Sequence, residues 1–298
     1  MRLNHVIVSA VIAFAGAIDL HAQSASLTFS PAAPAPGAVV RITLRDDGAS
    51  GDSIARISGT MSGEPLHFTR SGPDTWRAIG PITADASGDV EASVMIERLS
   101  GALDSARASV SIPKPEPVRR AARARALSVS PRFTRPLDAE TQARIDREND
   151  TAREIGRRAH DTAPMWSEPF IRPRAAAVTS RFGTGRMFNG TLSSRHLGVD
   201  FRGAVGAPVH AANRGVVALV ADFFLAGNVV YVDHGGGVVT AYFHLSKALV
   251  AAGDTVSRGQ EIGLVGATGR VTGPHLHWSA RYGTVTVNPL DLTLVGAP

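Results

Sequence analysis

The chain of 298 residues contains no cysteine. This absence excludes disulfide scaffolds, cysteine-ligated zinc, iron–sulfur clusters, thiol nucleophiles and a lipid-anchored N-terminal cysteine. Aromatic residues are also scarce, at 6%, whereas 30 glycines and 18 prolines are scattered without a period and favour a turn-rich protein built from strands. The hydrophobic share of 44% is ordinary for a globular protein, which excludes wholesale disorder. The length predicts about two domains, at roughly 150 residues each.

Residues 1–22 have the pattern of a secretory signal peptide. Arg2 and His5 precede an apolar run from Val6 to Ile18, whose thirteen residues are fewer than the about 20 that span a bilayer. Such a run fits the apolar region of a signal peptide, and Leu20-His21-Ala22 supplies a cleavage site. The alternative is a buried N-terminal helix. No later segment approaches the length of a membrane span, so we expect an exported protein without a transmembrane segment.

Residues 23–112 are predicted to form a small accessory β-sandwich of the Ig-like kind. Short runs with partial alternation of apolar and polar residues recur, and turn signals such as Asp46-Asp47-Gly48 separate them. Glu64, His67 and Asp74 are interpreted as solvated residues rather than as a site. The expected strands are Ala38–Leu44, Ser53–Gly59, Leu66–Phe68, Thr75–Ile79, Val90–Ile96 and Ala106–Ile112.

Residues 113–169 are the predicted connector. It begins with the stiff segment Pro113–Pro117 and continues with four arginines between residues 119 and 125. Residues 113–174 contain fourteen Lys or Arg and nine Asp or Glu, so this stretch accounts for the whole net charge of +5. The excess could attract an anionic envelope polymer. Because charge runs are commonly just solvated, we favour a solvated linker.

An amphipathic surface helix is predicted over residues 138–160 of this connector. Asp138 is placed to cap its N-terminus. Apolar residues recur on one face at helical spacing, at Ile145, Ala152, Ile155 and Ala159. Most of the other positions are charged. We therefore expect the helix to be able to pack on the C-terminal domain and to carry no chemistry.

Residues 170–298 predict a second, mainly antiparallel β domain. The stretch is rich in glycine and valine, and His234-Gly235-Gly236-Gly237 between two runs predicts a hairpin. The clearest strands are Val216–Ala221, Asn228–Asp233, Val238–Phe243, Glu261–Val265 and His275–Ala280. The chain as a whole is therefore predicted to be mainly β.

Six of the ten histidines lie between residues 196 and 277. His196 and Asp200 are four residues apart, and the glycine and valine between them disfavour a helix, so on a strand the pair would share a face. His275 and His277 are two apart and would also share a strand face. Two histidines and one carboxylate can form a catalytic zinc set whose fourth position is open to water.

Three further histidines are interpreted from their surroundings. His244 is predicted to end a strand, on the same face as Thr240 and Tyr242. His210 and His234 have no carboxylate at ligand spacing and are interpreted as structural or solvated.

Three motifs follow one another in the chain: His196-Leu197-Gly198-Val199-Asp200, Tyr242-Phe243-His244-Leu245-Ser246 and Gly273-Pro274-His275-Leu276-His277-Trp278. In this order they resemble the lysostaphin/LytM-type (β-lytic) zinc metallopeptidases, which cleave cell-wall peptides. The resemblance covers roughly residues 170–292. The N-terminal half is compatible with the β-sandwich extensions that some members carry.

The resemblance implies a role for each matching residue. His196, Asp200 and His277 would bind zinc (Zn²⁺), and His244 and His275 would be catalytic histidines beside the metal. One of the two would act as general base and the other would stabilise the oxyanion, and the sequence leaves open which does which. The chain departs from many members at Ser279, where they have an acidic residue.

The resemblance implies an exported zinc metalloendopeptidase that hydrolyses peptidoglycan stem or cross-link peptides, in the periplasm or as a secreted, cell-wall-associated protein. The alternative is a non-catalytic cell-wall-binding regulator of another hydrolase. Such members typically lose ligand positions, whereas all five residues are present here. A third hypothesis, nucleic-acid binding, rests on the basic charge alone and lacks aromatic residues interleaved on a sheet face. We expect peptidoglycan and no nucleic acid as partner, and a monomer.

Overall fold

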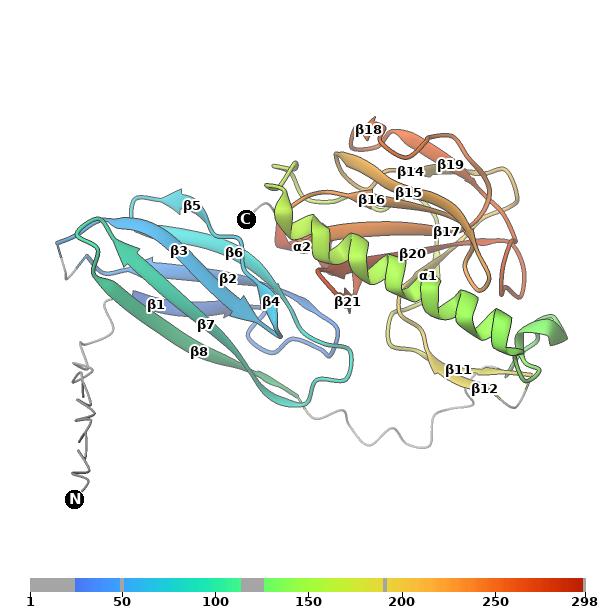
Figure 1. The fold of residues 1–298 in the computed structure, drawn as a ribbon, viewed down its shortest axis with the longest axis horizontal. Coiled ribbons are helices and arrows are strands. Elements are labelled where there is room, and N and C mark those ends of the chain that lie inside the picture. The colour runs from blue at the N-terminus through green and yellow to red at the C-terminus, as the bar shows by residue number, and fades with distance from the viewer. Residues whose placement is uncertain (1–24, 49–50, 114–125, 190–191, 297–298) are drawn as a thin grey trace, which may run out of the picture.

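The computed structural model describes residues 25–48, 51–113, 126–189 and 192–296. The predicted signal peptide, residues 1–22, and most of the Pro- and Arg-rich segment lie outside the described residues. Figure 1 shows two β-rich halves side by side, with the long helix α1 (Ala139–Arg158) running across the C-terminal half. No helix among the described residues is long and apolar enough to span a membrane. The predicted mainly-β class is confirmed.

The N-terminal half consists of two four-stranded sheets that face each other. The first has the order β1-β2-β6-β5 and contains β1 (Ala25–Ser30), β2 (Val39–Asp46), β6 (Thr75–Pro81) and β5 (Thr69–Gly72). The second has the order β4-β3-β7-β8 and contains β4 (Glu64–Pro65), β3 (Ile54–Met61), β7 (Gly88–Arg98) and β8 (Leu103–Ile112). Alternate residues of both sheets, such as Ile42 and Val110, share one buried cluster. Strand alternation therefore produces the core, as expected for a sandwich.

The predicted strand Leu66–Phe68 is wrong. These residues lie between β4 and β5 without strand structure. Leu66 is nonetheless buried in the sandwich core. Its apolar character therefore reflects burial in the core and not pairing with another strand.

The C-terminal half is built on one ten-stranded sheet whose main path is β10-β13-β20-β17-β16-β15-β18. The strands of this path are β10 (Val178–Ser180), β13 (Val199–Arg202), β20 (His275–Tyr282), β17 (Val238–Ala248), β16 (Gly227–Asp233), β15 (Gly215–Phe223) and β18 (Thr255–Val256). Off this path, β14 (Pro208–His210) pairs with β19 (Glu261–Val265), which also pairs with β17, and β21 (Val285–Val287) pairs with β20. A small separate sheet contains β9 (Ala126–Leu127), β11 (Gly185–Phe188) and β12 (Leu192–Arg195). The short elements η1 (Pro131–Phe133), η2 (Ala159–Asp161), η3 (Pro289–Asp291) and α2 (Leu292–Val295) complete the fold.

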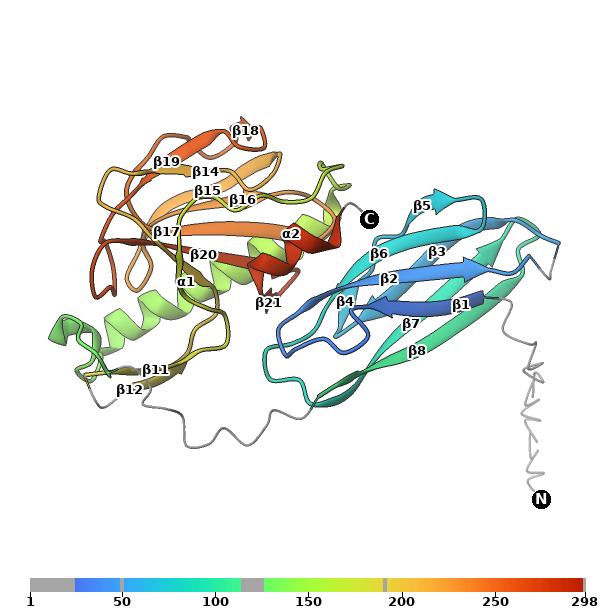
Figure 2. The ribbon, with the colours of Figure 1, turned by 180° about the vertical axis from the view of Figure 1, so that it is seen from behind.

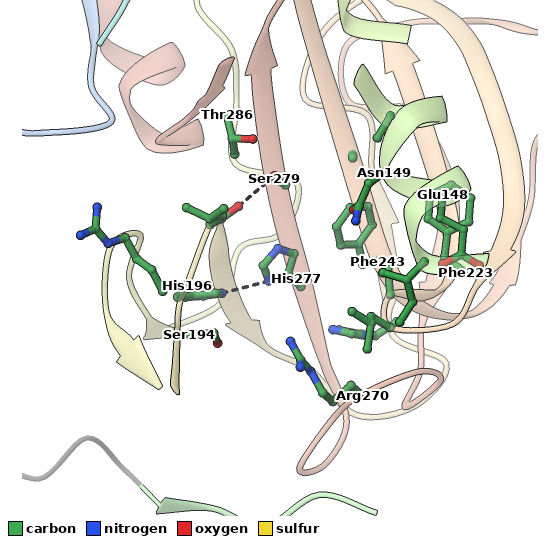
Figure 3. Close-up of a pocket in the computed structure, with 18 of the residues that line it drawn as sticks. Glu148, Asn149, Ser194, His196, Phe223, Phe243, Arg270, His277, Ser279 and Thr286 are labelled. Carbon is green, nitrogen blue, oxygen red and sulfur yellow. Dashed lines mark hydrogen bonds between the residues drawn. The ribbon is translucent and has the colours of Figure 1, made fainter. Parts of the chain in front are cut away.

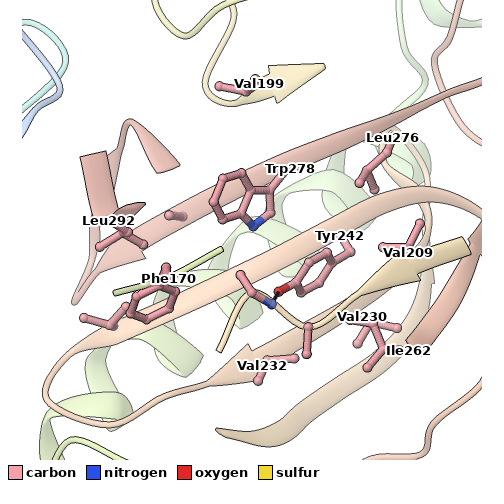
Figure 4. Close-up of a cluster of buried hydrophobic side chains, with 14 of the residues drawn as sticks. Phe170, Val199, Val209, Val230, Val232, Tyr242, Ile262, Leu276, Trp278 and Leu292 are labelled. Carbon is pink, nitrogen blue, oxygen red and sulfur yellow. Dashed lines mark hydrogen bonds between the residues drawn. The ribbon is translucent and has the colours of Figure 1, made fainter. Parts of the chain in front are cut away.

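One face of the large sheet packs on the main core of the domain. Tyr242 of β17 and Trp278 of β20 lie in this core without solvent exposure, next to Phe170 from the segment after the helix (Figure 4). The tyrosine hydroxyl accepts the Ala212 amide at 2.8 Å, so its polar end is satisfied inside the core. Tyr242 and Trp278 thereby anchor β17 and β20 in the core, and these are the two strands that carry His244, His275 and His277.

The opposite face of the sheet is covered by α1. Asp138 accepts a hydrogen bond from the Thr141 amide at 2.7 Å, which confirms the predicted N-cap. Ala152 and Ala159 pack in one cluster with Tyr231 and Ala241 of the sheet. The predicted apolar stripe of the helix is therefore its contact with the C-terminal half.

The two halves of the chain are in direct contact at the start of β2. Val39 belongs to the same buried cluster as Leu292 and Val295 of α2, which lies between the halves in Figure 2. The Asn288 amide donates to the Gly37 carbonyl at 2.7 Å, and the Val39 amide donates to the Asp291 carboxylate at 3.1 Å. Burial raises the pKa of Asp291 to about 6. The contact is thus both apolar and hydrogen-bonded.

A second contact between the halves corrects the interpretation of Glu64 and His67 as solvated. Glu64 is buried, accepts the Thr284 amide at 2.8 Å, and lies 3.0 Å from Nε2 of His160. His67 stacks on His160, with Nε2 of His67 at 2.8 Å from Nδ1 of His160. The hydroxyl of Tyr282 donates to the Pro65 carbonyl at 2.8 Å. The sandwich, the segment after α1 and the C-terminal sheet therefore meet at one polar cluster.

We expect Glu64→Ala to lower the free energy of unfolding by about 1–3 kcal/mol, because buried donors would lose their acceptor. Burial alone would raise the pKa of Glu64, but hydrogen bonds from His160 and Thr284 outweigh it and lower the pKa. The stabilisation is therefore full at neutral pH and is lost as the pH falls through the lowered pKa. Urea unfolding at pH 7 and at acidic pH measures this effect, with Glu97→Ala on the exposed side of β7 as control. Equal unfolding midpoints for wild type and Glu64→Ala at pH 7 would contradict it.

Candidate metal centre and active site

Strand pairing places the acidic residue and the paired histidines on one face of the sheet. Asp200 of β13 lies directly opposite His277 of β20 in the antiparallel register. Val199 and Leu276, their chain neighbours, point into the main core. Alternation then directs Asp200, His275 and His277 to the other face. The sequence pattern His-x-His predicts this shared face, and the structure has it.

His196 reaches the same point from outside a strand. The prediction that His196 and Asp200 share a strand face is wrong, because β13 begins at Val199 and His196 lies in the segment between β12 and β13. Its ring is nevertheless buried, with Nε2 at 3.0 Å from Oδ1 of Asp200 and 2.9 Å from Nδ1 of His277. Nδ1 of His277 lies 2.9 Å from the same Asp200 oxygen.

The donor set fits a metal ion. The three donor atoms of His196, Asp200 and His277 form a nearly equilateral triangle. Among the described residues, these three side chains are the group whose donor atoms lie close enough together to bind a metal ion. Ligands at 2.0–2.1 Å around a tetrahedral ion are about 3.3 Å apart, so a small outward shift of the side chains would admit one. Two imidazole nitrogens and one carboxylate leave the fourth position free.

Neighbouring groups hold these donors in the required form. Nδ1 of His196 donates to the Arg181 carbonyl at 3.0 Å, and since a carbonyl can only accept, Nε2 presents a lone pair to the metal position. Arg186 pairs with the second oxygen of Asp200. Burial would raise the pKa of Asp200, but its close contacts with the His196 and His277 side chains outweigh burial and lower the pKa. Burial lowers the pKa of His277 to about 4. The aspartate is thus ionised and this histidine neutral, as metal ligands must be.

His244 does not lie on the face predicted for it. Its φ of +62° interrupts the alternation of β17, and the strand continues beyond it to Ala248. Tyr242 points into the main core, whereas the ring of His244 lies 4.9 Å from that of His275 and 5.9 Å from that of His277. Its amide donates to the Ala226 carbonyl at 2.9 Å, which offsets part of the cost of the left-handed backbone.

In both His244 and His275, Nδ1 is held by a hydrogen bond to a backbone carbonyl, which leaves Nε2 on the other side of the ring. Nδ1 of His244 donates to the Thr268 carbonyl at 2.8 Å, and Nδ1 of His275 donates to the Gly273 carbonyl at 2.8 Å. Nε2 of His275 is buried 3.7 Å from Oδ1 of Asp200, with no hydrogen-bond partner among the described residues. Burial, followed by the neighbouring His275, lowers the pKa of His244 well below its ordinary value. Two imidazoles with free Nε2 atoms therefore border the metal position, and that of His244 is neutral.

Only glycine fits at position 198, because a larger side chain would clash with the ligand His277. A Cβ at this position would lie 2.4 Å from Nε2 of His277 and 2.7 Å from the Trp278 carbonyl. We expect Gly198→Ala to displace the His277 ring and to weaken metal binding by about 10- to 100-fold, the usual effect of disturbing a ligand's support. Competition with a chromophoric chelator measures the metal affinity.

The matched control is Gly72→Ala, where an added Cβ meets no atom closer than 3.6 Å. Unchanged metal affinity in folded Gly198→Ala would contradict the prediction.

The helix α1 forms one wall of a cavity over the metal position. This cavity, of about 300 Å³, is lined by His196, His244 and His277 on the sheet side. Glu148 and Asn149 of α1 face them across the opening (Figure 3). The helix was expected to carry no chemistry, yet it shapes the space beside the histidines. Sequence reasoning also did not single out Arg186 and Arg270, although Arg270 stands five residues before His275.

Three other residues considered in the sequence, Ser279, His234 and His210, lie beside or outside the metal position. The hydroxyl of Ser279 donates to the Leu197 carbonyl at 3.0 Å and so ties β20 to the segment that carries His196. His234 is fully buried, with Nδ1 bonded to the Arg214 carbonyl at 2.7 Å, which confirms a structural role. His210 lies on β14, outside the cavity.

The comparisons with known proteins agree with this geometry. The model of "Peptidase family M23" matches residues 194–289. The chain is 53% identical over 102 residues to peptidoglycan DD-endopeptidase ShyA of Vibrio cholerae, covering 34% of this chain and 24% of that protein. It is 43% identical over 99 residues to DD-carboxypeptidase/endopeptidase Mpg of Neisseria meningitidis, covering 33% and 23%. The chain thus spans about a quarter of the length of these relatives.

A solved structure extends the similarity to the N-terminal half. A putative peptidase M23 from Pseudomonas aeruginosa superimposes with a TM-score of 0.64 at 27% identity, over 88% of this chain and 96% of that one. The sandwich and helix therefore belong to an arrangement seen in another such protein. Residues 194–289, which match the family model, are thus similar to peptidase family M23, and the converged His–Asp–His site lies within this stretch.

Proposed function

We propose that the chain is a zinc metalloendopeptidase that hydrolyses peptide bonds in peptidoglycan stem or cross-link peptides. The observation that carries this proposal is the convergence of three donor atoms within about 3 Å of one another, with two further histidines beside them. Zinc suits a site of two imidazoles and one carboxylate with an open position.

The residues of the chain supply the rest of the chemistry. When bound, zinc supplies a Lewis acid that polarises the scissile carbonyl and makes an attacking water more acidic. His244 and His275 hold free Nε2 atoms beside that position. One can accept the proton of the attacking water and return it to the leaving amine. The other can donate to the oxygen on which negative charge develops.

The substrate class is supported by relatives and by the site. The printed names of ShyA and Mpg describe them as a peptidoglycan DD-endopeptidase and a DD-carboxypeptidase/endopeptidase. Since peptidoglycan lies outside the cytoplasm, the signal-peptide pattern of residues 1–22 fits the same function. All five site residues are present and converge, which gives no support to the non-catalytic alternative.

Digestion of purified peptidoglycan sacculi, followed by mass spectrometry of the released fragments, tests the function. We expect cross-linked dimers to be converted to monomers with new amino and carboxyl termini. A chelator should stop the conversion and added zinc should restore it. Release of fragments cut only in the glycan, or no change in the fragments, would contradict the proposal.

A further inference from the structure

Two cavities flank the metal-binding residues. The first, of about 300 Å³, is lined by His196, His244 and His277, and the second, of about 470 Å³, is lined by Asp200 and His275. A peptide that places its scissile bond at the metal position would extend into both. Three side chains line both cavities, those of Arg186, Phe188 and Arg270. They are therefore placed to contact substrate residues next to the cleaved bond.

The two arginines differ in how their charge is compensated. Arg186 pairs with Asp200 and lies 3.3 Å from the Ser180 hydroxyl. The guanidinium of Arg270 lies over the ring of Phe188, at 4.3 Å from its centroid. Within the described part of the chain no carboxylate or carbonyl accepts a hydrogen bond from it. The half-buried guanidinium of Arg270 therefore carries a positive charge and several N–H donors with no counter-ion among the described residues.

The surroundings of Arg270 are positive as well. The arginines that line the two cavities are Arg181, Arg186, Arg195, Arg202, Arg270 and Arg281. The carboxylates that line them are Glu148 and Asp200. Glu148 is paired with Arg144 at 2.7 Å, and Asp200 belongs to the metal site. The space around the scissile bond thus favours an anionic ligand.

We propose that Arg270 binds a free carboxylate on the substrate residue beside the scissile bond and thereby selects acidic over amidated peptides. This inference rests on the proposed endopeptidase function. Figure 3 shows Arg270 at the end of the pocket below His277, on the loop that precedes β20. A guanidinium held against an aromatic ring can meet a carboxylate with two parallel hydrogen bonds. Arg186, held by Asp200, acts as a positioning residue for the metal ligand.

The test uses two substrates that differ in one group. Soluble cross-linked muropeptide dimers with free carboxylates on the diamino acid are compared with the same dimers after amidation of those carboxylates. We expect the zinc-loaded wild type to cleave the acidic dimer with a kcat/KM about 10- to 100-fold higher, the usual worth of a charge-assisted hydrogen bond.

Two variants assign the preference to one side chain. Arg270→Gln should lose the preference by raising KM for the acidic dimer more than for the amidated dimer, and its zinc content should equal that of the wild type. Arg270→Lys should retain part of it, because the charge remains without the fork of donors. The control is Arg147→Gln, which removes an exposed charge of α1 that lines neither cavity.

The outcomes separate this inference from the function on which it rests. Equal cleavage of both dimers by the wild type would overturn the role of Arg270 and leave the endopeptidase function standing. An equal loss on both dimers in Arg270→Gln would also overturn it, since that pattern indicates a structural role. Absence of cleavage of either dimer by zinc-loaded wild type would overturn the proposed function and this inference together.

Discussion

Asp200→Ala should yield a folded protein that retains no zinc after dialysis and cleaves no peptidoglycan peptide. Oδ1 of Asp200 is within 3.0 Å of the facing nitrogens of both His196 and His277, so its loss removes one ligand and the negative charge of the site. Disturbing only the support of a ligand costs about 10- to 100-fold in metal affinity, and removal of the ligand itself should cost more. Elemental analysis of the purified variant measures the metal content.

A second variant and a control keep this prediction interpretable. Asp200→Ala also leaves Arg186 without its carboxylate, whereas Asp200→Asn preserves volume and still accepts a hydrogen bond from Arg186. Both variants should lose zinc. Asp89→Ala, an exposed carboxylate of β7, should retain one zinc per chain. Undiminished zinc in folded Asp200→Asn and Asp200→Ala would remove Asp200 from the ligand set.

Loss of His275 or His244 should separate metal binding from catalysis. We expect His275→Ala and His244→Asn to keep the zinc and to lower kcat by about 100- to 10,000-fold, the usual contribution of a general acid–base group. Asparagine is chosen at position 244 because it tolerates the positive φ of this residue and cannot act as a base. Zinc analysis together with steady-state cleavage of a muropeptide dimer measures both properties.

The control for these variants is His210→Gln, which changes a histidine outside both cavities. Near-normal turnover in His275→Ala or His244→Asn would show that the histidine in question is structural. Loss of zinc in His275→Ala would show that His275, and not its neighbour two residues on, binds the metal.

Much of the site follows from local sequence pattern, because strand alternation fixes which side chains share a face. The predicted strand Glu261–Val265 agrees with the structure at both ends. Leu276 and Trp278 are buried in the main core, so the alternating residues His275 and His277 lie together on the opposite face of the strand. Periodicity and burial are enough to predict these positions.

Other features depend on contacts between distant segments and leave no local pattern. The left-handed backbone at His244 follows from its bonds to Ala226 and Thr268, so alternation assigned its ring to the wrong face. In the sequence, Glu64 and His67 have the pattern of exposed residues. Their burial depends on contact with His160, which follows α1 and lies more than 90 residues away in the chain. A helix that covers a sheet face likewise gives no sign in its sequence that it will line a cavity.

Titration of metal-free protein with zinc, with cleavage of a cross-linked muropeptide dimer as readout, tests the central claim most directly. If His196, Asp200 and His277 form a single catalytic zinc site, activity should rise in proportion to added zinc and reach its maximum at one zinc per chain. Asp200→Ala should show no rise. Undiminished cleavage by the metal-free protein, or no cleavage at saturating zinc, would contradict the account.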